Sequence, residues 1–326
     1  MECIPSISFA LHRFWHLKQF VLAGINKLPN MRIKIFLLFL SLASICFGQT
    51  EYYIISADHN NIHVREFGQG IPIILLAGGP GLNANYMNDL WDTLSLDFRC
   101  IILDQRGTAK SFVPTIDSVS MSMENYINDL EALRKHLGIE KLTLIGHSWG
   151  GMLAMEYAAN KPDNIEKIIL LGPGGPTIKF ASYFTDNITV RLHPEDIRER
   201  DQLRNQNKRG LRAIWPGYFF DRTKALQSKA KIDFENLQGP IEINRFTSSN
   251  YFSDAINRTK LLKNFKGEVY IIQGRQDPIG ESTVYEIKEL LPQTQINFIE
   301  KCGHFPWLEN ESQVNEFYVL LKKYLE

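Results

Sequence analysis

The stretch from Lys141 to Asn160 reads KLTLIGHSWGGMLAMEYAAN, and it decides the fold. Its first residues, Lys141–Ile145, predict a buried strand, and Trp149–Asn160, which is rich in Ala and Met, predicts a helix. Between them, Gly146-His-Ser-Trp-Gly150 matches the pattern G-x-S-x-G. The serine backbone is strained in such a strand-to-helix turn, and the flanking glycines prevent side-chain collisions. This position predicts that the Ser148 hydroxyl stands above the sheet edge as a nucleophile.

Strands and helices alternate along the rest of the chain. The predicted strands are Glu51–Ser56, Asn61–Phe67, Ile71–Leu76, Arg99–Leu103, Ile165–Leu171, Glu268–Gln273 and Gln295–Ile299. The predicted helices are Asn85–Leu96, Ser122–Leu137, Ser282–Leu291 and a last one near Ser312–Tyr324. We expect the first two strands to form a hairpin. The alternation predicts the α/β class, with a mostly parallel eight-stranded sheet and helices on both faces.

The alternation stops between residues 177 and 264. This segment is polar and dotted with aromatic residues, and its spacing is mostly helical, with no clear buried strand. We interpret it as a helical cap packed over the carboxyl ends of the strands. The core would then consist of residues 49–176 and 265–326.

A serine hydroxyl needs a base to take its proton, and two histidines follow Ser148. His304 comes just after the last predicted strand, where a base is needed, whereas His193 precedes Pro194 and is more simply a helix start. Asp277 lies in the loop after the preceding strand, in the order Ser, Asp, His. Its predicted role is to hold the imidazole tautomer and stabilise the imidazolium; the alternative is a turn residue before proline.

Two backbone N–H groups are expected to stabilise the negative charge that develops during attack. One belongs to Trp149, the residue after the nucleophile. The other comes from Gly78-Gly-Pro-Gly81, which follows the strand Ile71–Leu76 and lets backbone approach a substrate closely. Gly79 is the predicted donor, with Gly78 as the second choice.

Five motifs together resemble the proline iminopeptidase family, which consists of α/β-hydrolases with a helical cap. They are Ala77-Gly-Gly-Pro-Gly81, Asp104-Gln-Arg-Gly107 with Ser111, Gly146-His-Ser-Trp-Gly-Gly151, Gly274-Arg-Gln-Asp277 and Gly303-His304. The resemblance covers roughly residues 51–326. The chain departs from the family pattern at Ala77, where the family has His, and at Ala109, where it has Gly.

The resemblance implies an aminopeptidase that removes N-terminal residues, often proline, from peptides. In these peptidases cap carboxylates hold the free amino group of the substrate, and Glu195, Glu235 and Glu242 are the candidates here. The simpler interpretation of each is a solvated helix residue. Relatives with this framework include esterases, so a carboxylesterase or lactonase with the same triad is one alternative. A non-catalytic ligand-binding protein on a hydrolase scaffold is another.

Other side chains have a simpler structural interpretation. Arg106 could brace the loop around Gly79 through Asp104 or through backbone carbonyls. The basic run Arg191–Arg212 is most simply a solvated helix face of the cap. Six aromatic residues of the cap could line a pocket or pack the cap against the core, namely Trp215, Tyr218, Phe219, Phe220, Tyr251 and Phe252.

The N-terminal residues have the pattern of a signal peptide. Basic residues follow Met31, an apolar run extends over Ile35–Ile45, and small residues lead to a cleavage site near Gly48. We therefore expect residues 31–48 to be a signal peptide, residues 1–30 an upstream extension, and the mature protein to be exported. An internal signal anchor is the alternative. The apolar run is too short to span a bilayer, so no membrane span is expected after cleavage.

The composition does not point to nucleic-acid binding, metal binding or a cofactor. The 326 residues carry no formal net charge, which gives no indication of a nucleic-acid partner. The sequence contains no cluster of Cys and His residues that would predict a metal site, and it contains no motif that would predict a cofactor. Cys100 and Cys302 fall on distant strands, so no disulfide is expected. The expected partner is a small peptide or small ester substrate, and the oligomeric state is left open.

Overall fold

The computed structural model describes residues 49–206 and 210–326, so the predicted extension 1–30 and signal peptide 31–48 lie outside the described residues. Within this part, eight strands form one sheet in the order β1-β2-β4-β3-β5-β6-β7-β8. The strands are β1 Thr50–Ile55, β2 Asn61–Phe67, β3 Pro72–Leu76, β4 Arg99–Leu103, β5 Leu142–His147, β6 Ile165–Leu171, β7 Glu268–Gly274 and β8 Gln295–Ile299. β1, β2 and β4 pair antiparallel, and the remaining neighbours pair parallel. The predicted fold class is confirmed.

Helices cover both faces of the sheet, and successive side chains of a strand pack into the apolar clusters on opposite faces. In β3, Ile74 and Leu76 belong to one apolar cluster, and Ile73 and Leu75 belong to the other. The first cluster includes residues of α4 Met123–Leu137, α5 Trp149–Asn160 and α13 Glu281–Leu290. The second includes residues of α3 Asn88–Leu94 and α14 Glu311–Leu325.

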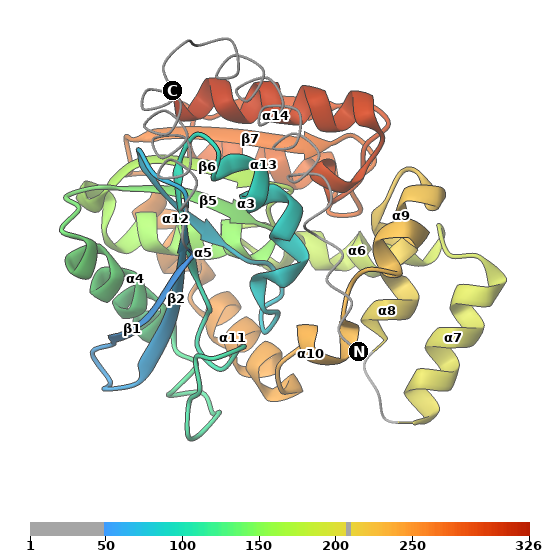
Figure 1. Cartoon of the computed structure of the whole chain (residues 1–326), viewed down its shortest axis with the longest axis horizontal. Coiled ribbons are helices and arrows are strands. Elements are labelled where there is room, and N and C mark those ends of the chain that lie inside the picture. Colours follow the sequence, from blue (N-terminus) through green and yellow to red (C-terminus); the bar gives the residue numbers. More distant parts are fainter. Residues whose placement is uncertain (1–48, 207–209) are drawn as a thin grey trace, which may run out of the picture. The chain divides into compact units, whose positions relative to one another are not determined.

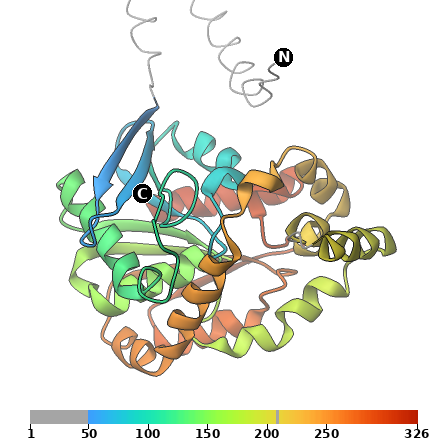
Figure 2. The ribbon, with the colours of Figure 1, turned by 90° about the horizontal axis from the view of Figure 1, so that it is seen from below.

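Between β6 and β7, every named element of the described residues is a helix. These helices are η3 Ile178–Phe180, α6 Ala181–Thr189, α7 Pro194–Asn205, α8 Leu211–Ile214, η4 Trp215–Tyr218, α9 Arg222–Lys229, α10 Phe234–Leu237, α11 Ile241–Ser253 and α12 Ala255–Leu262. Figures 1 and 2 both show α7, α8 and α9, in yellow, beyond one end of the strands. His193 directly precedes α7: its N–H donates to the Asp196 carboxylate at 3.0 Å, and its carbonyl oxygen accepts the N–H of Asp196 at 3.0 Å.

Three short helices complete the described part, namely η1 Ala84–Met87, η2 Pro162–Asn164 and η5 Pro306–Leu308. The helix predicted at Asn85–Leu96 is thus divided into η1 and α3, and it begins earlier because the Asn83 side chain caps it by accepting the N–H of Asn85. Cys100 in β4 and Cys302 after β8 are both free and buried. No helix in the described ranges is long and apolar enough to cross a membrane.

Candidate active site

Ser148 lies between β5 and α5 with a backbone conformation that few side-chain-bearing residues adopt. Its φ is 54° and its ψ is −116°. The two glycines of the motif are required by close contacts. A Cβ at Gly146 would lie 2.4 Å from the carbonyl oxygen of Gly150, and a Cβ at Gly150 would lie 2.1 Å from that of Leu76. The chain can therefore make this sharp turn only with glycine at both positions.

Asp277 and His304 meet although they are 27 residues apart. Asp277 Oδ2 lies 2.8 Å from His304 Nδ1, and both side chains are buried. The other carboxylate oxygen, Oδ1, accepts the N–H of Ile279 at 2.8 Å, which fixes the carboxylate in the turn after β7. Because Nδ1 faces the carboxylate, the opposite ring nitrogen Nε2 is the atom left to exchange a proton.

Gly172, which follows β6, leaves the space that this pair occupies. Its φ is +47°, and a Cβ there would lie 2.5 Å from Asp277 Oδ2 and 3.0 Å from His304 Nδ1. Gly172 is not among the site residues predicted from the sequence. A glycine directly after the strand beside the nucleophile is the signal that could have identified it.

Ser148 and His304 line the same cavity, which has a volume of about 570 Å³. No hydrogen bond joins the Ser148 hydroxyl to the His304 imidazole among the described residues. Catalytic hydrogen bonds are often long in enzymes without substrate and shorten when the substrate binds. The structure thus brings the three predicted residues to one site, with the Asp277–His304 contact already formed.

The two predicted donors, Gly79 and Trp149, differ from Gly78 in whether their N–H groups already have an acceptor. The N–H groups of Gly79 and Trp149 have no acceptor among the described residues, and both residues line the cavity. In contrast, the Gly78 N–H donates to the Tyr86 hydroxyl at 2.6 Å, so it is not free to bind a substrate oxygen. Gly78, the second choice for this role, is therefore wrong as a donor, although it lines the cavity and packs against Ser148.

Tyr86 and His147 extend this contact into a chain of hydrogen bonds. The Tyr86 hydroxyl lies 2.7 Å from His147 Nδ1, and His147 Nε2 lies 3.0 Å from the carbonyl oxygen of His304. A carbonyl can only accept, so the proton sits on Nε2, and Nδ1 accepts from Tyr86. Burial, together with the nearby His304, holds the pKa of His147 well below its ordinary value. The chain thus links the loop of Gly78 to the backbone of His304 through a neutral imidazole.

Gln105 supports the same loop from a third side. Its Nε2 donates to the carbonyl oxygen of Ala77 at 2.8 Å, and its Oε1 accepts the indole N–H of Trp149 at 2.8 Å. This one buried amide therefore holds the backbone two residues before Gly79 and the side chain of Trp149. Gln105 is not among the residues predicted from the sequence to support this loop, whereas its neighbour Arg106 is.

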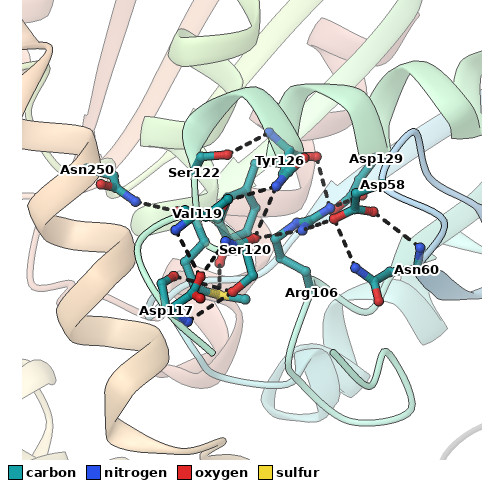
Figure 3. A network of polar contacts seen from close by, with 12 residues as sticks. Asp58, Asn60, Arg106, Asp117, Val119, Ser120, Ser122, Tyr126, Asp129 and Asn250 are labelled. Carbon is teal, nitrogen blue, oxygen red and sulfur yellow. Dashed lines mark hydrogen bonds and ion pairs between the residues drawn. The ribbon is translucent and has the colours of Figure 1, made fainter. Parts of the chain in front are cut away.

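Arg106 instead belongs to a network of polar contacts with α4 and the loops before it (Figure 3). Its guanidinium pairs with both carboxylate oxygens of Asp129, at 2.9 and 2.7 Å, and with Asp58 at 2.9 Å. It also donates to the carbonyl of Ser120 at 2.7 Å. The expected contact with Asp104 is wrong, because Asp104 pairs with His63 and Arg65. Arg106 therefore joins α4 to the loops before it.

Glu309 fixes the loop that carries His304. Its carboxylate accepts the N–H of Gly303 at 2.8 Å and the N–H of Phe220 at 2.8 Å. Burial raises the pKa of this carboxyl group, although these N–H groups oppose the shift. The N–H of His304 itself donates to the carbonyl of Tyr218 at 2.7 Å. The base is thus attached to the cap segment at Tyr218–Phe220.

The cavity lining differs from the predicted substrate-binding residues. None of Glu195, Glu235 and Glu242 lines it. Glu195 is exposed in the first turn of α7 and pairs with Arg222 at 2.8 Å; Glu235 is exposed in α10, and Glu242 is half-buried in α11. The prediction that these carboxylates bind the substrate is therefore not supported by their positions, because a helical spacing does not define which face points inward.

The lining is mainly apolar and aromatic. Trp215 and Tyr218 are the two of the six predicted cap aromatics that contribute to it; Phe219, Phe220, Tyr251 and Phe252 do not. Tyr251 instead packs edge-on against Trp149. Arg200 and Arg204 also line the cavity, so the basic run Arg191–Arg212 is more than a solvated helix face.

Comparison with known proteins agrees with the fold. Residues 71–311 match the model of the alpha/beta hydrolase fold family. A proline iminopeptidase of Lactobacillus helveticus is 26% identical over 81% of this chain and 92% of its own length. A 2-hydroxy-6-oxo-6-phenylhexa-2,4-dienoate hydrolase of Comamonas testosteroni is 26% identical over 78% of this chain and 88% of its length. An esterase of Rhodococcus sp. ECU1013 superposes with a TM-score of 0.64 at 20% identity, covering 83% of this chain and 98% of its own. The chain therefore belongs to the alpha/beta hydrolase fold family and is similar to the proline iminopeptidases within it.

Proposed function

We propose that this protein is a serine hydrolase that forms an acyl-enzyme on Ser148 and acts as an aminopeptidase on peptides with N-terminal proline or another small apolar residue. The observation that carries the proposal is the Asp277–His304 contact of 2.8 Å beside the strained Ser148, with both His304 and Ser148 on one cavity.

The reaction follows from these positions. His304 Nε2 takes the Ser148 proton while Oγ forms a bond to the scissile carbonyl carbon, and the carbonyl oxygen becomes an oxyanion. The N–H groups of Gly79 and Trp149 donate to that oxygen. The carbon–nitrogen bond then breaks, and the proton on His304 goes to the leaving amine. Water repeats the sequence and releases the acyl group, which regenerates Ser148.

The choice of a peptide substrate rests on similarity to proline iminopeptidases along most of both chains. A second candidate is a hydrolase of small esters with the same triad. The cavity favours this ester hydrolase, because no Asp or Glu among the described residues lines it to bind a free amino group.

Two assays test the proposal together. A fluorophosphonate probe should label the wild-type protein but not Ser148→Ala, and absence of labelling would favour a non-catalytic binding protein. Proline and alanine nitroanilides should be hydrolysed beside a p-nitrophenyl ester. Turnover of the ester without any anilide turnover would reject the peptidase and leave the esterase.

We also propose export, which rests on the signal-peptide pattern of residues 31–48. N-terminal sequencing of the protein recovered outside the cytoplasm tests it. A mature chain that begins near Gln49 is expected, and a protein that keeps residues 31–48 would contradict cleavage.

A further inference from the structure

The charged side chains that line the cavity are of one sign. Apart from histidines, they are Arg200 and Arg204, both from α7, and no carboxylate lines it within the described ranges. We infer that these two arginines form an anion-binding subsite, so that the substrate carries a carboxylate in addition to its scissile bond. This inference rests on the proposed function, because it concerns the substrate of the same cavity.

The two arginines are placed to act together. They are four residues apart on α7, so they share one face of the helix. Gly210, which also lines the cavity, packs against this face, since a Cβ there would lie 3.5 Å from Arg200 Cγ. Two planar guanidinium groups on one face can bind a carboxylate through several parallel hydrogen bonds.

Little of the positive charge is neutralised within the described chain. Arg200 pairs only with its sequence neighbour Asp201, at 3.1 Å, and that carboxylate is about half exposed. Arg204 has no ion pair with a described residue. The other acidic residues of α7 already have cationic partners: Glu195 and Asp196 pair with Arg222, and Glu199 pairs with Arg212 and Lys229.

The rest of the lining restricts the substrate further. Phe180, Phe184, Ile188 and Ile214 are among the apolar residues that line the cavity between the core and α7. At the end of the cavity formed by α7, a carboxylate would be attracted by the two positive charges, whereas an amino group would be repelled. The expected substrate thus has an apolar body that ends in an anionic group.

A carboxylate could come from either side of the scissile bond. In a dipeptide it is the C-terminal carboxylate of the leaving amino acid. In a half-ester it belongs to the acyl group. The shared chemistry is one carboxylate held by α7, and two matched pairs of ligands separate the sources: prolyl-alanine against prolyl-alaninamide, and 4-nitrophenyl hydrogen glutarate against its neutral methyl ester.

Binding is measured by calorimetry in the Ser148→Ala background, so that the result does not depend on turnover. We expect one pair to show roughly 10- to 100-fold tighter binding of the anionic member, since hydrogen bonds to charged groups have this strength. The preference should fall towards unity in Arg204→Gln and in Arg200→Gln, and Arg200→Lys should restore part of it. Arg198→Gln is the control, because Arg198 is exposed on the same helix and does not line the cavity.

The outcomes separate the two proposals. Equal binding of both members in both pairs, or a preference that survives Arg204→Gln and Arg200→Gln, overturns the subsite even if the fluorophosphonate labels Ser148. A carboxylate preference that disappears in these variants supports the subsite, and if labelling is absent in that case, only the proposed function fails.

Discussion

His147 and His304 are joined side chain to backbone: the Nε2–H of His147 donates to the carbonyl oxygen of His304 across 3.0 Å. His147 precedes the nucleophile, so the turn that holds Ser148 and the loop that holds the base are fixed to each other. The other ring nitrogen accepts from Tyr86, which in turn receives the Gly78 N–H. One neutral imidazole therefore sets the spacing of the nucleophile, base and oxyanion loop.

Removing the Tyr86 hydroxyl should disturb this spacing without removing a catalytic group. We expect Tyr86→Phe to lower kcat about ten-fold with little change in KM, because the Gly78 N–H and His147 Nδ1 both lose their partner. Tyr157→Phe is the matched control, since its buried hydroxyl bonds Glu131 instead. Steady-state kinetics on a p-nitrophenyl ester measure the effect, and equal losses in both variants would contradict a positioning role for Tyr86.

Gln105 should affect stability and activity together. Gln105→Met leaves the Ala77 carbonyl and the Trp149 indole N–H without partners, which should cost about 1–3 kcal/mol of unfolding free energy and reduce kcat. Gln273→Met is the control, because the Gln273 amide is fully buried but has no hydrogen-bond partner among the described residues. Urea unfolding and kinetics compare the two. A larger loss in Gln273→Met would show that burial, and not the two contacts, determines the effect.

Two glycines separate backbone strain from crowding at the site. Gly172 and Gly138 have φ values of +47° and +65°, but a Cβ at Gly138 meets nothing within 4 Å. Gly138→Ala should therefore cost about 1 kcal/mol of stability and leave activity unchanged. Gly172→Ala should in addition displace Asp277 and lower kcat/KM by more than about 100-fold. Similar activities in the two variants would contradict the claim that Gly172 leaves the space that Asp277 needs.

The raised pKa of Glu309 predicts a pH dependence of stability. In the folded state the carboxyl group keeps its proton above the ordinary value of 4.5, where the unfolded chain has already released it. The contribution of Glu309 to stability is therefore complete below 4.5 and decreases as pH rises through the folded pKa. Glu309→Gln, which cannot ionise, should gain stability relative to wild type as pH rises from 4 to 7 in urea unfolding. A difference that is constant with pH would contradict the raised pKa.

The sequence was sufficient for the features that repeat locally. Two alternating runs and the apolar runs that follow them predicted all eight strands, and the positions of Asp277 and His304 after β7 and β8 followed from strand order. The contacts between distant segments were beyond it. Tyr86 and His147 are 61 residues apart, and nothing in either motif indicates that their side chains meet.

The cap was predicted least well for a related reason. Helical spacing indicates that a face is polar, but not whether that face points to solvent or to a cavity. Glu195 was thus assigned to the substrate and Arg204 to the solvent alone. In the structure Arg204 is exposed but also lines the cavity, and Glu195 pairs with Arg222.

The acyl-enzyme on Ser148 is the claim on which the account depends. Rapid acid quench of the protein with p-nitrophenyl acetate, followed by digestion and mass spectrometry, tests it directly. We expect an acetyl group on the peptide that contains Ser148, formed together with a burst of nitrophenol, and neither in Ser148→Ala. An acyl group on a different residue, or full ester turnover by Ser148→Ala, would contradict it.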